Sequence, residues 1–429
     1  MAKNYVEQNV YEATMDRVKY LFDEFENVLI AFSGGKDSSI CLNVCYDYAK
    51  EHGLLDKLAM FHMDYEAQYQ FTTDYVTETF KNFPGIRKYW LCLPIAAQCC
   101  CNMSSGYWIP WEKKRKDIWV RSMPDSEYVI HEDNVPFSFK QAQSDYLVQN
   151  SFSQWFSSVN GSTAVVIGIR ASESLNRYRA IKSDKKVNTY MGKNYIVSTN
   201  KSTHNSYIIY DWEVEDVWTA NAKFGWTYNK LYDLYYQAGV PVDKMRVASP
   251  FNDCAAESLK LYKVIDPNTW GKMVSRVNGV NFTGIYGGTT AMGWKSITLP
   301  KGHTWKSYLE FLLGTLDEPV RQNYIQKFTT SLEFWKEKGG VMDDETIQEL
   351  EENNNLDMQV REVGGKKKVT FEVYPDDVDV TNFQMVPTYK RMCVCILKND
   401  YYCKYMGFAQ TKDLLVKRKR AVEKYRNLL

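Results

Sequence analysis

A turn built from small residues joins an apolar run to a helical pattern near the start of the chain. The apolar run spans residues 28–32, and the turn that follows it spans residues 33–39. A continuous apolar run of this length is typical of a strand that is buried on both faces of a sheet. Beyond the turn, apolar side chains recur at helical spacing from Ile40 to Tyr48. The pattern predicts a strand, a tight loop and a helix, which together form the basic unit of a parallel α/β sheet.

The residues of this turn suit the binding of an anion. Gly34 and Gly35 let the backbone approach a ligand closely, and successive amide groups there can form a concave nest. The start of the following helix adds partial positive charge, and Lys36 adds a full charge. Asp37 is the exception, because a carboxylate beside phosphate is repelled unless it caps the helix or holds Mg²⁺. The alternative is a glycine-rich turn that Asp37 caps and that binds nothing.

Strands and helices continue to alternate as far as Pro250. Strands are predicted at residues 58–63, 89–93, 164–169 and 207–210, and helices at 12–25, 140–159, 211–220 and 228–238. This alternation favours an α/β fold with a parallel sheet and helices on both faces. The later part of the chain predicts a mixed α+β region, with helices at 304–313, 320–338 and 411–429 and strands at 369–373 and 392–397. We therefore expect two domains, residues 1–250 and 251–429.

Composition excludes several classes of protein. The chain has 429 residues, of which 45% are hydrophobic and 24% are charged, as is ordinary for a soluble globular protein. Its 53 Lys and Arg residues against 52 Asp and Glu residues exclude a uniformly basic nucleic-acid binder. The sequence has neither an apolar run of about 18 residues nor the apolar core of a signal peptide, so we expect a cytoplasmic protein with no membrane span. Ten cysteines in so long a chain predict reduced thiols rather than a disulfide scaffold.

Two further groups of polar residues follow predicted strands. Asp64 ends the second strand, where a carboxylate either contacts ribose or adenine or caps a helix. After the clearest later strand, Arg170 and Arg177 can each make forked hydrogen bonds to phosphate or sulfate oxygens. Glu173 lies four residues before Arg177 and can orient it on a helix. Because ligands gather at the carboxyl ends of parallel strands, both groups are candidates for the same site as the turn at 33–39. A solvated, charged helix is the alternative for the second group.

These segments carry a resemblance to a known superfamily. The segment Ser33-Gly34-Gly35-Lys36-Asp37-Ser38 resembles the PP-loop of the adenine nucleotide α-hydrolase-like superfamily, which includes ATP pyrophosphatases and 3′-phosphoadenylyl-sulfate (PAPS) reductases. The segments at 168–177 and 209–218 resemble counterparts in the PAPS reductases. The resemblance implies ATP or a PAPS-like nucleotide as ligand, with Mg²⁺ near Asp37 accompanying the nucleotide. It implies catalytic roles for Lys36, Asp37, Arg170 and Arg177. The implied nucleotide-binding residues are Ser33, Gly34, Gly35, Lys36, Asp37, Ser38, Ser39, Asp64, Gly168, Arg170, Glu173, Ser174 and Arg177.

The later segments at 249–253 and 389–408 resemble one branch of the PAPS reductase-like family. This branch has its own C-terminal region and includes the immunoglobulin-binding regulator proteins of enterobacteria. The resemblance implies a ParB/sulfiredoxin-like protein as partner. The basic stretch at 417–420 adds nucleic acid as a weaker candidate partner, with a solvated helix face as the alternative.

One motif of the assimilatory reductases is missing. Their E-C-G-x-H segment, whose cysteine attacks the sulfur, has no counterpart, and Cys403 lies in a different context. The run Cys99-Cys100-Cys101 lacks the spacing of iron–sulfur sites, so we interpret it as buried or partly exposed thiols. We therefore expect an enzyme that cleaves ATP to AMP and pyrophosphate and adenylylates an acceptor. The alternatives are sulfonucleotide-dependent sulfur transfer or reduction, linked to sulfur metabolism, and a non-catalytic nucleotide-sensing module associated with DNA in regulation or defence.

Overall fold

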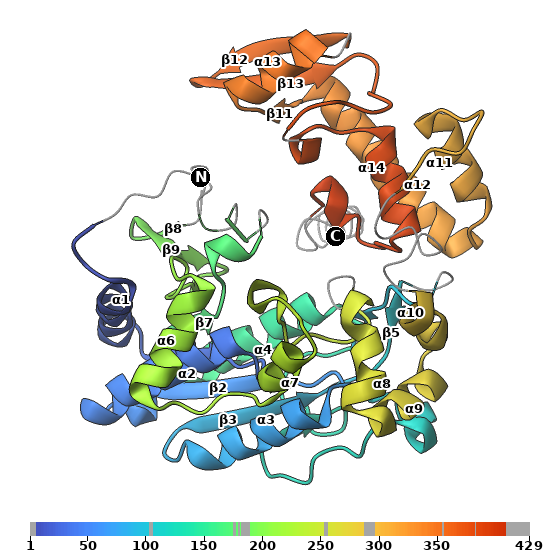
Figure 1. Ribbon diagram of the computed structural model, residues 1–429. Helices are drawn as coiled ribbons and strands as arrows, with labels where there is room; N and C mark the ends of the chain where they lie inside the picture. Colours follow the sequence, from blue (N-terminus) through green and yellow to red (C-terminus); the bar gives the residue numbers. More distant parts are fainter. Residues whose placement is uncertain are drawn as a thin grey trace, which may run out of the picture. The chain divides into compact units, whose positions relative to one another are not determined.

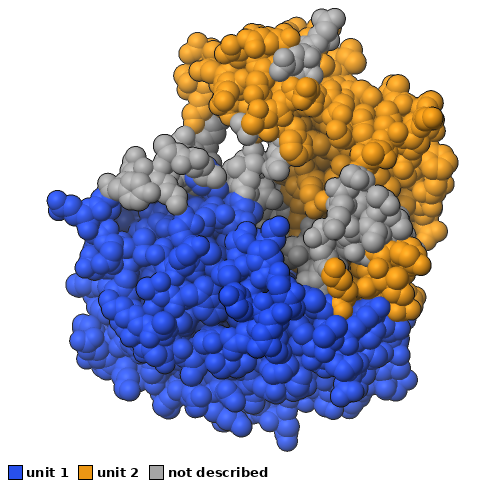
Figure 2. Space-filling model, in the orientation of Figure 1, with its two compact units in different colours: residues 1–97, 109–250, 261–276 blue, residues 98–108, 251–260, 277–429 orange. Residues whose placement is uncertain are grey.

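The chain divides into two compact units. The computed structural model describes residues 6–102, 106–174, 177–178, 181, 189–252, 256–286, 297–353, 356–381 and 383–408. Unit 1 comprises residues 1–97, 109–250 and 261–276, and unit 2 comprises residues 98–108, 251–260 and 277–429 (Figure 2). The expected division into domains at residue 250 stays a prediction.

Unit 1 is built on an eight-stranded sheet in the order β6-β3-β2-β1-β7-β10-β9-β8; β2, β3, β7, β8 and β9 are labelled in Figure 1. Its first five strands and β10 run parallel, and β9 and β8 extend one edge in antiparallel fashion. The strands are β1 (Asn27–Ala31), β2 (Leu58–Met63), β3 (Arg87–Cys92), β6 (Val129–His131), β7 (Thr163–Ile167), β8 (Thr189–Tyr190), β9 (Lys193–Ser198) and β10 (Thr203–Ser206). The expected α/β fold with a mostly parallel sheet is confirmed.

Helices cover both faces of this sheet. In the described residues, the α-helices of unit 1 are α1 (Val10–Glu24), α2 (Lys36–Glu51), α3 (Gln70–Asn82), α4 (Asp145–Asn160), α6 (Val214–Phe224), α7 (Leu231–Gln237), α8 (Tyr262–Ile265) and α9 (Pro267–Arg276). Short 3₁₀ helices are η1 (Leu55–Lys57), η2 (Lys113–Ile118), η3 (Ala171–Glu173) and η4 (Val242–Lys244). Within the described ranges, no helix combines the length and the apolar character that a membrane crossing needs.

The alternation of side chains along β1 shows why the strand is apolar throughout. Val28 and Ile30 belong to the core formed with α1, α2, α3 and α6. Leu29 is fully buried too, but side chains of neighbouring residues in a strand point to opposite faces. The opposite face is covered by α4, whose Phe152 ring lies 5.0 Å from the ring of Phe61 on β2. The apolar run at 28–32 therefore reflects burial on both sides of the sheet.

Unit 2 is a mixed α+β assembly. Its helices are α10 (Val280–Tyr286), α11 (Trp305–Gly314), α12 (Glu318–Glu337), α13 (Asp344–Asn353) and α14 (Tyr389–Leu397), with the 3₁₀ helices η7 (Phe383–Met385) and η8 (Lys404–Met406). A three-stranded antiparallel sheet has the order β11 (Gly340–Val341), β13 (Lys366–Phe371) and β12 (Met358–Val363). The short strands β4 (Ala97–Gln98) and β5 (Tyr107–Trp108) pair with each other, and η5 spans Ala256–Leu261. The expected α+β character of the later chain is confirmed.

Two expected strands are wrong. Residues 207–210 form a turn after β10, and Ile208 and Ile209 are apolar because they pack in the α1 core rather than because they pair. Thr203–Ser206, a polar segment, makes the parallel ladder with β7 instead. Residues 392–397 lie in α14, where the Thr388 side chain accepts a hydrogen bond from the backbone of Arg391 and starts the helix. The expected basic helix at 411–429 lies outside the described residues.

Candidate functional site

The loop after β1 lies where the sheet changes the direction of its connections. β2 and then β3 follow on one side of β1, and β7 and β10 lie on the other. Such a switch point opens a crevice at the carboxyl ends of the strands, and ligands of open α/β sheets bind there. The loops after β1 and β7 both leave the carboxyl ends of these neighbouring parallel strands. Topology therefore places the loop at 33–39 and residues 168–174 at the ends of two neighbouring parallel strands.

The loop after β1 is shaped by its two glycines and by serine hydroxyls. Gly34 has a φ of +76°, a left-handed conformation that glycine adopts without strain. Gly35 is the N-cap of α2, and no side-chain hydrogen bond caps the start of this helix. The hydroxyl of Ser38 accepts from the Ser33 amide at 3.1 Å and contacts the Ser33 hydroxyl at 3.0 Å. The hydroxyl of Ser39 donates to the Gly35 carbonyl at 2.9 Å. Serine hydroxyls thus fold the loop, while the Lys36 amide at the helix start donates to the Tyr232 hydroxyl.

Gly168 lets the end of β7 approach the start of α2. A Cβ atom at Gly168 would lie 2.8 Å from the amide nitrogen of Ser38 and 2.9 Å from the carbonyl carbon of Asp37. Real Cβ atoms almost never approach other heavy atoms so closely. The glycine was predicted as a nucleotide-binding residue, and in the structure it sets the closeness of the two loops.

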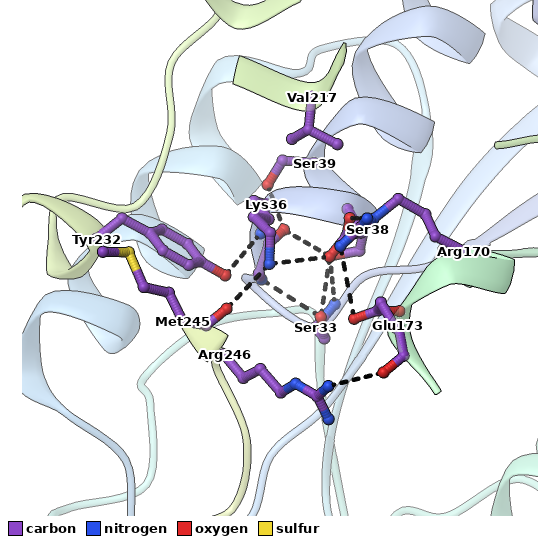
Figure 3. Close-up of polar contacts among 12 residues, drawn as sticks. Ser33, Lys36, Ser38, Ser39, Arg170, Glu173, Val217, Tyr232, Met245 and Arg246 are labelled. Carbon is purple, nitrogen blue, oxygen red and sulfur yellow. Dashed lines mark hydrogen bonds and ion pairs between the residues drawn. The ribbon is translucent and has the colours of Figure 1, made fainter. Parts of the chain in front are cut away.

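Lys36 is buried at the centre of the site (Figure 3). Its ammonium group donates to the carbonyl oxygen of Met245 at 2.9 Å and lies 3.4 Å from a carboxylate oxygen of Asp37. Burial lowers the pKa of Lys36, and the positive charges of Arg170 and Arg246 lower it further, against the opposing effect of Asp37. A buried ammonium surrounded by other cations is a strong anchor for an anion.

Asp37 pairs with two cations. The Nε atom of Arg170 donates to Oδ1 of Asp37 at 2.6 Å, and Lys36 lies by the other carboxylate oxygen. Arg170 is only 3% exposed, and it also donates to the Ser172 hydroxyl at 3.2 Å. Both oxygens of Asp37 are therefore engaged by positive charge.

These contacts do not fit a magnesium ion held by Asp37. A Mg²⁺ ion needs carboxylate oxygens that are free to coordinate it. In the described part of the chain, no group of three or more His, Cys, Asp or Glu side chains is placed to hold a metal. The residues present therefore do not fit the expected Mg²⁺ at Asp37, and no step below depends on it.

The loop after β7 contributes a second charged group. Glu173 forms ion pairs with Arg177 and, at 3.8 Å, with Arg170. The i,i+4 contact of Glu173 with Arg177 is the one that the sequence predicts. Ser174 accepts a hydrogen bond from the Arg177 amide at 3.3 Å. Arg246 reaches the same loop and donates to the Glu173 carbonyl oxygen at 3.2 Å (Figure 3).

Asp64 ends β2, as predicted, but it is held by its own network. The fully buried carboxylate forms an ion pair with Arg121 and accepts from the Trp90 indole at 2.7 Å and from the Glu66 amide at 2.9 Å. Burial raises the pKa of Asp64, but the charges of Arg121 and His62 and the hydrogen bonds from Trp90 and Arg121 together outweigh it, so that the pKa is lowered. This carboxylate is neither a helix cap nor joined by a described contact to Lys36 or Arg170.

Four residues of the site were missed from the sequence. The backbone amide of Lys36 donates to the hydroxyl of Tyr232 at 3.0 Å, and the Asn229 side chain donates to the Gly34 carbonyl at 3.1 Å. Met245 and Arg246 are the others. All four come from α7 and the segments beside it, and the contacts of Asn229, Tyr232 and Met245 with the loop after β1 join residues 195 to 209 positions apart. The only available signal was the helical pattern of α7, which carries no information about its distant contacts.

The cysteines give no support to a reactive thiol. All nine cysteines that the structure describes are buried, including Cys99, Cys100, Cys101 and Cys403. Burial raises the pKa of Cys92 and Cys395, and the contact with Cys101 together with burial raises the pKa of Cys99. A thiol with a raised pKa is a weak nucleophile because the thiolate is the attacking form. The interpretation of the Cys99–Cys101 run as buried thiols agrees with the structure.

Comparison with known proteins gives one relative over nearly the whole chain. The Escherichia coli (strain K12) protein named "Uncharacterized protein YbdN" is 32% identical over 412 residues, which cover 94% of this chain and 92% of that protein. A family model described as a domain of unknown function, DUF3440, matches residues 239–417.

Solved structures give weaker matches. A phosphoadenylyl-sulfate (PAPS) reductase from Candida auris, in a phosphate complex, matches with a TM-score of 0.31 and 14% identity over 58% of this chain and 98% of that chain. An FMN adenylyltransferase of Candida glabrata, in complex with FMN and the ATP analogue AMPCPP, matches with a TM-score of 0.31 and 12% identity. This second match covers 54% of this chain and 62% of that one. Matches with such low TM-scores carry no information about function, so the function is argued from the site itself.

Proposed function

This chain belongs to the family of YbdN of Escherichia coli, and on that premise we propose that it binds the phosphates of an adenine nucleotide in the crevice between the loops after β1 and β7. The observation that carries the proposal is the charge gathered there. Among the described residues, four cations, Lys36, Arg170, Arg177 and Arg246, face two carboxylates, Asp37 and Glu173, which leaves two positive charges in excess within this set. A surplus of this kind in a largely buried site is balanced by a polyanion such as a di- or triphosphate.

The residues divide between the two ends of the phosphate chain. The positive end of α2 and the Lys36 ammonium bind the β- and γ-phosphates, because helix charge favours an anion there even though the Lys36 amide itself is engaged by Tyr232. Arg170 and Arg177 bind the α-phosphate or an acidic group of the acceptor, since guanidinium groups match two oxygens at once. Tyr232 and Asn229 hold the loop through hydrogen bonds with its backbone.

The reaction that we propose is adenylyl transfer. An acceptor oxygen forms a bond to the α-phosphorus of ATP, and the bond from that phosphorus to the bridging oxygen breaks. Pyrophosphate leaves with the electron pair, and AMP stays on the acceptor. An ionised acid as acceptor needs no proton removed before attack. The chain contributes position and charge stabilisation, chiefly through Lys36 and Arg170, which neutralise the charge of the leaving group and of the reacting phosphate.

Sulfonucleotide reduction is the weaker candidate. It requires a nucleophilic thiol, and the described cysteines are buried. Cys254 lies outside the described residues. Binding of adenosine 3′,5′-bisphosphate compared with ATP separates the two candidates, because a clear preference for the bisphosphate favours the sulfonucleotide.

The test is a binding titration with α,β-methylene ATP, an analogue that cannot release pyrophosphate. Lys36→Ala and Arg170→Ala are each expected to weaken its binding by about tenfold or more, because each removes a charged contact to phosphate. Lys50→Ala is the matched control, since Lys50 is an exposed lysine in the last turn of the same helix. Melting curves establish that the variants are folded. Wild-type affinity in both site variants would refute the proposal.

A pyrophosphate-release assay with ATP then tests the chemistry. We expect release by the wild type to fall by at least about a hundredfold in both site variants, because each loses charge stabilisation of the transition state. Binding of ATP without any release would leave the nucleotide-sensing alternative.

A further inference from the structure

A short segment after α7 crosses the candidate site. We call Met245–Val247 the strap. The Met245 carbonyl accepts from the Lys36 ammonium at 2.9 Å. A Cβ atom placed at Gly35 would lie 3.6 Å from the Cβ of Val247, so the strap packs directly on the loop. Between these residues, Arg246 leaves the strap and reaches the loop after β7 (Figure 3).

The contacts of Arg246 differ from those of the other cations in the site. Lys36 and Arg170 share the Asp37 carboxylate, and Arg177 is paired with Glu173. Among the described residues, the hydrogen bond of Arg246 is to a neutral acceptor, the Glu173 carbonyl oxygen. Its guanidinium is partly buried and close enough to Lys36 for their like charges to repel. A guanidinium has five N–H donors, and this hydrogen bond uses one of them.

The charge balance assigns a role to this residue. Lys36, Arg170 and Asp37 together carry one positive charge, and the Arg177–Glu173 pair carries none. Arg246 supplies the second excess charge. Holding like charges together in a site costs free energy unless an anion binds among them.

Resting on the proposed function, we propose that Arg246 contacts the phosphate chain and sets the preference of the site for a pyrophosphate group over a single phosphate. A monophosphate is satisfied by the helix start with Lys36 and Arg170. A pyrophosphate extends further and carries more charge, and the guanidinium that bridges the strap and the loop after β7 binds its second phosphoryl group. The adenylyl donor selected in this way carries a pyrophosphate that can leave.

The experiment measures binding of inorganic pyrophosphate and of inorganic phosphate to the full chain by calorimetry. Arg246→Gln is expected to weaken pyrophosphate binding by about tenfold or more, as the loss of a charge-assisted hydrogen bond predicts. Phosphate binding is expected to change by less than about threefold, since its contacts stay in place. Arg246→Lys keeps the charge and is expected to restore part of the preference.

Lys244→Gln is the matched control, because Lys244 is an exposed cation two residues earlier on the same segment. It is expected to bind both probes as the wild type does. Equal losses for the two probes in Arg246→Gln, or no loss, would overturn the role of Arg246. A wild type that binds neither pyrophosphate nor α,β-methylene ATP would overturn the proposed function as well, so the two failures are distinguishable.

Discussion

Replacing Gly168 with alanine tests whether the closeness of the two loops is what builds the site. The added Cβ atom would lie 2.8 Å from the Ser38 amide nitrogen, whereas ordinary contacts begin at 3.4 Å. The atoms that it meets are backbone, so no flexible side chain can turn aside. The end of β7 and the start of α2 must move apart by about 0.6 Å to reach ordinary contact.

The expected cost of this movement is about 1–3 kcal/mol, the usual range for extra atoms forced into a packed interior. At about 2–4 °C of melting temperature per kcal/mol for larger domains, the shift is measurable by calorimetry. The displacement also separates Arg170, two residues after Gly168, from Asp37 at the helix start. We therefore expect weaker binding of α,β-methylene ATP in the same variant.

Gly271→Ala is the control for this prediction. Gly271 lies inside α9, and a Cβ atom there meets nothing within 4 Å. Alanine is favoured over glycine in a helix interior, so the control is expected to gain about 0.5–1 kcal/mol. A Gly168→Ala variant that melts with the wild type and binds the analogue equally well would refute the idea that this close approach shapes the site.

Two further predictions concern buried ion pairs of unit 1. Arg276→Met is expected to destabilise the protein by about 3–5 kcal/mol, because the buried Glu66 carboxylate loses the guanidinium that binds it at 2.9 Å. Calorimetry measures this loss, and an unchanged melting temperature would contradict the prediction. Because folding lowers the pKa of Asp64, its ionised carboxylate stabilises the folded protein. This contribution is complete above the unfolded-state pKa of about 4 and is lost as pH falls through the folded-state pKa. Asp64→Asn, which also leaves Arg121 unpaired at neutral pH, is expected to flatten this acid-side decline in melting temperature, and parallel curves for the two proteins would count against it.

The loop after β1 was predictable because its signals are local. An apolar run, two glycines, a lysine and a helical pattern lie within about twenty residues, and each supports the same strand–loop–helix unit. The Glu173–Arg177 contact was predictable for the same reason, since spacing along one turn fixes it. Pairings set by topology were predictable only in outline, because a parallel sheet brings strand ends together without saying which side chains meet.

Contacts made across long stretches of chain were not predictable. The residues around Arg246 and Tyr232 carry no sequence signal for a contact with the candidate site. They become neighbours of the site only when the chain folds. The strand at 203–206 was missed since its residues are polar, and residues 392–397 were assigned to a strand since a short apolar run fits either element. The sequence leaves Asp64 either as a contact to ribose or adenine or as a helix cap, and the partner that engages it, Arg121, follows it by more than fifty residues.

The salt bridge between Glu66 and Arg276 has a consequence for anyone who wishes to divide this molecule. Arg276 belongs to a stretch that returns to unit 1 after the chain has already entered unit 2. Cutting the polypeptide at residue 250 removes α8 and α9 from unit 1. The buried carboxylate of Glu66 then loses its counterion, Arg276. The two parts are interlaced along the chain, so dissection requires grafting the returning stretch onto the first part rather than a single cut.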